Sequence, residues 1–393
     1  MELKTPPMVN EGDHLIGAFV GDPAGPTLIV VGSVHGNEPA GAEALLKLSE
    51  ELAEISQNFR GRVYLLAGNT RALAGRVRFI HRDLNRSWTK NNLGVVGSQR
   101  LKKVSECREL TEIDQLLDSI LITAQSEVIV LDLHSTSAGG VPFATVGDTL
   151  RNRMFAQKFP VRILLGIEEQ LDGTMLEYLN NAGAVTLGFE GGRHDSIETE
   201  ENHISLIWLA LVNAGILPDA DVPNLKLHRS RLAAGKRRSP IVEIRYREAI
   251  TAGDDFEMMP GFNNFDPIYK GQVLAKNRHG AIHAIESGMI LMPLYQKLGE
   301  DGFFIGRPVA PFWLKLSEIL RRMKVQNLIH WLPGVERDPD DPETLIVNTR
   351  LARFFPLQIF HLLGFRRRRW SDDKLFVSRR RHDTESPFVQ QWR

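Results

Sequence analysis

The sequence has 393 residues, of which 42% are hydrophobic, and its 48 basic side chains balance 48 acidic ones. This length allows two domains, the composition excludes wholesale disorder, and the zero net charge argues against a nucleic-acid-binding surface. The single cysteine, Cys107, excludes an internal disulfide and a cysteine-rich zinc module.

The N-terminal residues lack the basic and apolar pattern of a signal peptide, and no run approaches the ~18 apolar residues of a membrane span. We therefore expect a cytoplasmic protein without a membrane span or a nucleic-acid partner, which could form a homo-oligomer.

The first half of the chain alternates short apolar runs with amphipathic stretches. Apolar and β-branched residues predict buried strands over residues 27–32, 63–67, 127–133, 161–165 and 184–189. Apolar residues three and four apart predict helices over 39–55, 107–124 and 204–214. Strands separated by helices predict an α/β domain with a parallel or mixed sheet, from about residue 10 to about residue 220.

From residue 239 the pattern changes to short apolar runs punctuated by glycine and proline, which predicts a small β domain over 236–310. Residues 312–323 predict a helix with a core-facing stripe that comprises Phe312, Trp313, Leu316, Ile319 and Leu320. The polar residues 336–344 predict a linker or long loop, and the basic residues after Phe365 predict a solvated, partly disordered tail.

His35 and Glu38 follow the strand predicted at 27–32 and lie three residues apart at a loop-to-helix junction. This spacing can place an imidazole and a carboxylate on one face of a first helical turn, and both groups are ligands of zinc. The pair alone is a weak signal, but it stands beyond the carboxyl end of a strand, where open α/β sheets bind their ligands.

Two further predicted strands end with similar residues. His134 follows the strand at 127–133, and Glu190 follows the strand at 184–189. We expect Gly191 and Gly192 to let a substrate approach, and we expect Asp132 to lie on the opposite face of its strand from His134. Three strand ends that carry His/Glu, His and Glu predict one convergent site.

A fourth segment carries Arg78, Asn85 and Arg86. Two arginines flanking an asparagine suit a carboxylate-bearing substrate, because a guanidinium binds carboxylates through two hydrogen bonds and also stabilises an oxyanion.

In this order, residues 32–38 (GSVHGNE), 78–86 with Asp83-Leu-Asn-Arg86, 132–136 (DLHST) and Glu190 resemble the succinylglutamate desuccinylase/aspartoacylase family of zinc carboxypeptidase-like hydrolases. The resemblance covers most of residues 10–310. It implies an α/β fold with a zinc-carboxypeptidase-like mixed sheet flanked by helices, followed by a smaller β-rich C-terminal domain. We place these domains at residues 1–235 and 236–330, with a linker and basic C-terminal extension over 331–393.

The resemblance also implies roles for single residues. The ligands of one Zn²⁺ per chain would be His35, Glu38 and His134. Glu190 would be the general base that activates the zinc-bound water, and Arg78 would polarise the scissile carbonyl. Asn85 and Arg86 would hold a substrate carboxylate.

Several residues outside these motifs have no secure match to the family. Arg193 and His194 follow the base without a matched role, and Tyr295 is the nearest candidate for the family's aromatic cap. We expect His194 and His203 to be surface or capping groups.

These observations predict a zinc-dependent deacylase that cleaves the amide bond of an N-acyl amino acid or a similar small carboxylate-bearing substrate. The same site could serve a zinc carboxypeptidase or an esterase, and a non-catalytic metal- or ligand-binding module could share the fold. Glu190 and Arg78 argue against the last alternative, because metal binding alone needs neither of them.

Overall fold

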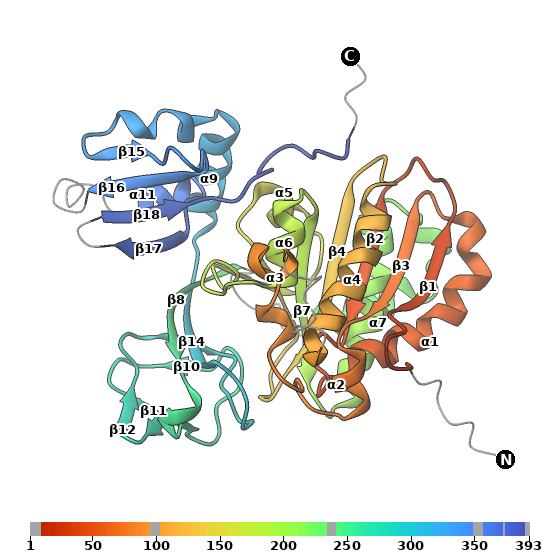
Figure 1. Ribbon diagram of the computed structural model, residues 1–393, viewed down its shortest axis with the longest axis horizontal. Coiled ribbons are helices and arrows are strands. Elements are labelled where there is room, and N and C mark those ends of the chain that lie inside the picture. The colour runs from red at the N-terminus through yellow and green to blue at the C-terminus, as the bar shows by residue number, and fades with distance from the viewer. Residues whose placement is uncertain (1–8, 95–102, 234–240, 349–356, 372–373, 390–393) are drawn as a thin grey trace.

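The computed structural model describes residues 9–94, 103–233, 241–348, 357–371 and 374–389 (Figure 1). Eleven strands of this part of the chain form one mixed sheet. In spatial order they are β1 (Leu15–Val20), β3 (Arg62–Ala67), β2 (Thr27–Gly32), β4 (Val128–Thr136), β7 (Val185–Arg193), β5 (Phe143–Val146), β6 (Arg162–Leu165), β8 (Ile241–Ala249), β14 (Asp301–Pro308), β13 (Gly288–Leu291) and β10 (Pro267–Ile268).

The centre of this sheet is buried on both faces, as the apolar run of β2 predicts. Strands β3, β2, β4 and β7 are parallel neighbours. Leu28 and Val30 pack with α1 (Ala40–Ile55) and α7 (Ile197–Asn213), whereas Ile29 and Val31 pack with α4 (Ser105–Leu121) and α6 (Met175–Asn181). Successive side chains of a strand point to opposite faces, so one apolar run serves both layers of helices. The predicted α/β fold with a mixed sheet is confirmed.

Several short elements complete the α/β part of the chain. They are α2 (Thr70–Ala74), α3 (Lys90–Gly94), α5 (Leu150–Ala156) and α8 (Leu225–Leu232). The predicted strands and helices of this part are present, and the prediction missed β1, β5, α6 and these four short helices. Short helices and edge strands carry too few apolar residues for a clear periodicity.

The β-rich region continues the main sheet. Strand β8 pairs in parallel with β6 and antiparallel with β14, so main-chain hydrogen bonds join this region to the α/β layer. A separate three-stranded sheet lies in the same region, in the order β12 (Gly280–His283), β11 (Val273–Asn277) and β9 (Glu257–Met258).

The C-terminal residues fold into a third unit, which lies apart from the three-stranded sheet in Figure 1. Its four-stranded sheet has the order β15 (Val335–Arg337), β16 (Thr344–Asn348), β18 (Lys374–Ser378) and β17 (Arg367–Ser371), and its helices are α9 (Pro311–Arg322) and α11 (Leu357–Leu362). Most of the predicted linker at 336–344 is therefore the connection between β15 and β16.

The expectation of a solvated, partly disordered tail is wrong for the described residues. Val377 of β18 is buried in a core with Phe360, and Arg366 forms ion pairs with Asp148 and Glu243. Both acidic partners of Arg366 lie more than a hundred residues away along the chain, so a local count of charges could not reveal them. The side chains of Arg367–Arg369 lie outside the described residues.

The predicted core-facing stripe of α9 is confirmed only in part, since Leu320 packs against the C-terminal core while three other members do not. Phe312, Trp313 and Ile319 are exposed, whereas Ser317 and Arg321 are buried. Arg321 turns inward because its guanidinium donates to Asp148 and to Asp383. Helical periodicity identifies an apolar face but does not say what covers it.

Candidate active site

The site lies at the carboxyl ends of β2, β4 and β7, which are neighbours in the sheet. His134 and Glu190 are direct partners across β4 and β7, and Gly32, three residues before His35, pairs with Leu133. The structure thus brings the three predicted strand ends together. The cavity there measures about 110 Å³ and is lined by the seven predicted site residues His35, Glu38, Arg78, Asn85, Arg86, His134 and Glu190.

The turn between β2 and α1 holds His35 and Glu38. Ser33 has a φ of 60°, a left-handed conformation, and its hydroxyl donates to the carbonyl oxygen of Glu38 at 2.8 Å. Gly36 is needed here, because a Cβ at this position would lie 2.1 Å from the carbonyl carbon of Ala72. Helix α1 begins only at Ala40, so the two side chains meet in a turn and not in a first helical turn.

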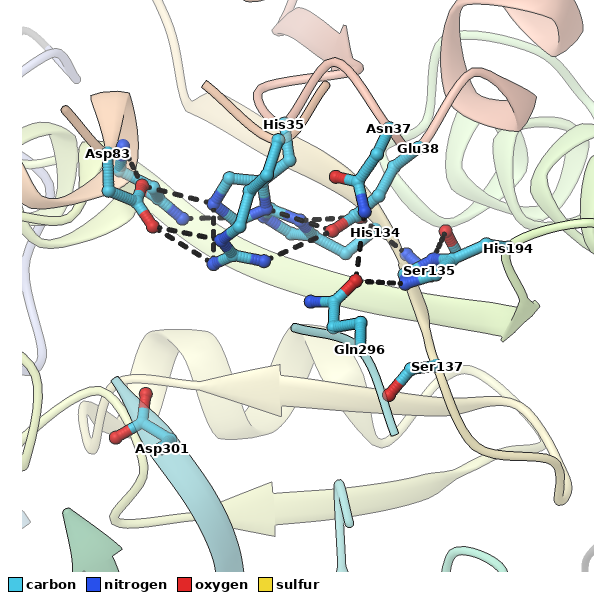
Figure 2. A network of polar contacts seen from close by, with 12 residues as sticks. His35, Asn37, Glu38, Asp83, His134, Ser135, Ser137, His194, Gln296 and Asp301 are labelled. Carbon is cyan, nitrogen blue, oxygen red and sulfur yellow. Dashed lines mark hydrogen bonds and ion pairs between the residues drawn. The ribbon is translucent and has the colours of Figure 1, made fainter. Parts of the chain in front are cut away.

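One ligand atom from each of His35, Glu38 and His134 lies within 4.8 Å of the others, and all three side chains are buried. Nδ1 of His35 lies 2.9 Å from Oε1 of Glu38, and Nδ1 of His134 lies 3.2 Å from Oε2 (Figure 2). Ligands that share one ion through bonds of about 2 Å are separated by comparable distances. This group could hold a metal ion.

The opposite ring nitrogens of both histidines face carboxylates. Nε2 of His35 lies 3.1 Å from Oδ1 of Asp83, and Nε2 of His134 lies 2.8 Å from Oδ2 of Asp132. Such carboxylates fix the ring and its tautomer in metal sites, which leaves both Nδ1 atoms free for an ion. The expectation for Asp132 is wrong, because residues two apart on a strand point to the same face.

The charges around the group fit a cation. The pKa of Glu38 lies well below its usual value because His35 and His134 outweigh the effect of burial. The pKa of His134 lies well above its usual value because Asp132 and Glu38 outweigh burial in the opposite direction. A proton on His134 thus balances nearby carboxylates in the metal-free protein. A metal ion would take its place, since a coordinating imidazole nitrogen must be deprotonated.

Glu190 lies beside this group without joining it. Its Oε2 atom is buried and has no hydrogen-bond partner among the described residues. Burial raises the pKa of this carboxyl to about 8. Buried polar atoms are nearly always paired, so an orphaned carboxylate oxygen in a cavity indicates a missing partner such as water or a ligand.

Arg78 and Asn85 are both hydrogen-bonded to Asp83, which lies between them in the sequence. Nε and Nη2 of Arg78 donate to Oδ2 of Asp83, and the charges of Asp83 and Glu38 outweigh burial and raise the pKa of Arg78. Oδ1 of Asp83 accepts from the backbone N–H of Asn85. Asn85 accepts from the N–H of Met175 through its Oδ1 atom. Asp83 thus links His35, Arg78 and Asn85, a role that the sequence analysis quoted within the motif but did not assign.

Two histidines expected at the surface belong to the site or its support. His194 lines the cavity and lies 2.8 Å from the Ser135 hydroxyl and 3.1 Å from Oε1 of Gln296 (Figure 2). His203 is buried against the carbonyl oxygen of His134 at 3.0 Å, and burial lowers its pKa to about 4. Neither role could be found from a motif, because both depend on contacts across elements.

The glycines after Glu190 serve packing. A Cβ at Gly191 would lie 2.5 Å from Nε2 of His203, and one at Gly192 would lie 2.7 Å from Oγ1 of Thr199. These two glycines allow α7 to pack closely against β7, and neither of them lines the cavity. The expectation that they let a substrate approach is therefore wrong. Tyr295 does not line the cavity; its hydroxyl lies 3.0 Å from the carbonyl oxygen of Met259, to which it donates, and accepts from the backbone N–H of Phe262.

The fold and the His–Glu–His group define a carboxypeptidase-like α/β protein with a candidate metal site. Residues 24–205 match the model of the succinylglutamate desuccinylase/aspartoacylase catalytic domain. This segment is a little under half of the chain, and it is similar to the catalytic domain of that family.

Single proteins of this kind resemble the chain either over a short alignment or at low sequence identity. The succinylglutamate desuccinylase of Pseudomonas fluorescens (strain Pf0-1) is 28% identical over 112 residues, which are 28% of this chain and 31% of that enzyme. The alignment thus spans about a third of the length of this curated relative.

Two solved structures share the fold. The X-ray structure of a succinylglutamate desuccinylase from Vibrio parahaemolyticus has a TM-score of 0.55 at 16% identity, with 77% of this chain and 90% of that chain covered. A succinylglutamate desuccinylase/aspartoacylase from Rhodobacter sphaeroides has a TM-score of 0.54 at 19% identity, with 75% and 88% covered. Among the described residues, no helix is both long and apolar enough to cross a membrane.

Proposed function

We propose that this protein is a zinc-dependent hydrolase that cleaves the amide bond of a small N-acyl amino acid or a similar carboxylate-bearing substrate. The observation that carries the proposal is the buried, unpartnered carboxylate of Glu190 beside the His35, Glu38 and His134 group. A metal-binding module has no use for such a carboxylate, whereas a hydrolase needs a base beside its metal. The small cavity favours a small substrate.

Two nitrogen ligands and one carboxylate, each ring supported by a second carboxylate, form a donor set that zinc prefers in catalytic sites. When bound there, Zn²⁺ acts as a Lewis acid and makes a water molecule more acidic.

Glu190 would accept the proton of the attacking water and deliver it to the leaving nitrogen. Burial raises the pKa of this carboxyl in the metal-free protein, and a cation bound beside it would lower the pKa again, so that the carboxylate could take up a proton and release it. No hydrogen bond to the described residues has to be broken before Oε2 can reach water.

Arg78 would stabilise the oxyanion that develops on the scissile carbonyl. Asp83 fixes the guanidinium through Nε and Nη2, while Nη1 lies 3.8 Å from Oε1 of Glu38, which is longer than a hydrogen bond. A fixed cation with a donor to spare lowers the transition-state energy without reorganising. Asn85 and Arg86 would hold the carboxylate of the substrate.

The test joins metal analysis to a substrate panel. The purified protein is expected to contain one zinc per chain and to hydrolyse at least one of a series of N-acetyl- and N-succinyl-amino acids. Peptides and esters with the same carboxylate form the second and third arms of the panel. Preferential cleavage of either would assign the site to a carboxypeptidase or an esterase, and stoichiometric zinc without any turnover would favour the binding module.

A further inference from the structure

The guanidinium of Arg86 has two nitrogens held by hydrogen bonds and a third, Nε, without one among the described residues. Its Nη1 donates to the carbonyl oxygen of Asn85 at 2.9 Å, and its Nη2 donates to Oδ2 of Asp301 at 3.1 Å. Its Nε atom is buried and has no hydrogen-bond partner among the described residues. Oε2 of Glu300 approaches this Nε only to 3.5 Å.

Asp301 is itself fixed by a second arginine. The first residue of β14, Asp301 accepts a hydrogen bond from Nε of Arg247 on β8 at 2.5 Å. Nη1 of Arg247 donates to the carbonyl oxygen of Gln170 at 2.6 Å. Arg247 does not line the site cavity but lines a different one, so it supports Asp301 from behind.

The two neighbouring acids differ in how tightly they are held. The side chain of Asp301 is 16% exposed and bridges two guanidinium groups, whereas that of Glu300 is 59% exposed and, within the described part of the chain, makes the 3.5 Å contact alone. An exposed ion pair of this kind contributes little free energy, so Glu300 can leave at small cost. A largely buried acid between two arginines is more costly to move.

The balance of charge leaves room for one more anion. Arg86 and Arg247 carry two positive charges, and Asp301 supplies one firmly held negative charge. We propose that Asp301, held by Arg247, is a positioning residue that presents the Nε edge of Arg86 to the substrate carboxylate, and that Glu300 caps this edge until substrate binds. The inference rests on the proposed function and deepens it, since it names the residues that set the affinity for a carboxylate-bearing substrate.

The test follows the Nε–H signal of Arg86 by NMR, assigned by its absence in Arg86→Lys, during titration with acetate at constant ionic strength. In the wild-type protein this signal is expected to shift saturably. Asp301→Asn and Arg247→Met are each expected to weaken acetate binding about tenfold, and Glu300→Gln to strengthen it about threefold, because the competing carboxylate is removed.

Arg245→Met is the matched control, since Arg245 is a partly exposed arginine on the same strand that pairs with Glu243. It is expected to leave acetate binding unchanged. If Arg247→Met behaves like this control, or if Asp301→Asn strengthens binding, the positioning role is wrong. If the Arg86 signal does not respond to acetate at all, the carboxylate subsite is wrong as well.

Kinetics separate this inference from the proposed function. With a hydrolysed substrate, Asp301→Asn and Arg247→Met are expected to raise KM while kcat changes less than about twofold, and the amide of the same substrate is expected to be insensitive to both. Acetate binding with this pattern but no hydrolysis of any acyl compound would overturn the proposed function alone. Hydrolysis with unchanged KM values would overturn this inference alone.

Discussion

Replacing Glu190 by glutamine removes a proton acceptor while it keeps the size and shape of the side chain. Loss of a general base lowers rates by about 10²–10⁴, which corresponds to roughly 3–5 kcal/mol of transition-state stabilisation. We expect kcat of Glu190→Gln to fall by this factor and the zinc content to stay at one per chain, because Glu190 is not among the three grouped ligands.

The structure also predicts a change in the pH dependence of stability for this variant, which can be measured without a substrate. In the metal-free protein the pKa of Glu190 is raised to about 8, whereas the unfolded chain has a value near 4.5. Between these values the folded protein holds a proton that the unfolded chain releases. The contribution of Glu190 to the free energy of unfolding is therefore most favourable below about pH 4.5, and it is lost as the pH rises toward 8.

The assay measures urea unfolding of metal-free protein from pH 5 to pH 9. Relative to the wild type, Glu190→Gln is expected to become progressively more stable as the pH rises, because glutamine does not titrate. Glu198→Gln serves as the control, since Glu198 lies exposed in the first turn of α7. Parallel pH curves for wild type and Glu190→Gln, or loss of zinc from the variant, would falsify the assignment of Glu190 as a buried base.

Three further outcomes are expected. His35→Ala should abolish stoichiometric zinc binding, and Asp132→Asn should weaken it about 10–100-fold, because the carboxylate orients the ring of His134; equal zinc affinity in competition with a chelator would contradict this. Arg78→Ala should lower kcat with little change in zinc content, since its contact strengthens as charge develops on the carbonyl; an effect on KM alone would argue against it. Truncation after Phe365 should destabilise the whole protein by several kcal/mol, because it removes the buried Arg366 and Asp383 and leaves the buried Arg321 with one of its two acidic partners; an unchanged unfolding midpoint would show that the unit is not coupled to the rest.

The sequence by itself determined the α/β architecture and the general position of the site. The run at 27–32 is apolar without interruption, and a strand of this kind must be buried on both faces of a sheet. Metal-ligating and acid–base residues that follow three such strands come together at one edge of the sheet if the strands are parallel neighbours. His35, Glu38, His134 and Glu190 meet for this reason, which depends only on local patterns and on the geometry of a parallel sheet.

Tertiary structure decided what surrounds these residues. Asp83 reaches His35 across 48 residues, and Asp301 reaches Arg86 across 215. No local pattern encodes such pairs, because the distance between two side chains is set by the packing of the elements that carry them. The pair of Asp132 and His134, by contrast, was within reach of the sequence, because the period of a strand places residues two apart on one face.

The C-terminal unit shows the same division most clearly. Its charged residues look solvated when they are counted along the chain, yet Arg321 is 1% exposed and Arg366 pairs with acids of the α/β layer. Burial of a charge is favourable only where a partner of opposite charge and further hydrogen bonds await it. The chain supplies those partners from Asp148, Glu243 and Asp383, and only the folded structure brings them together.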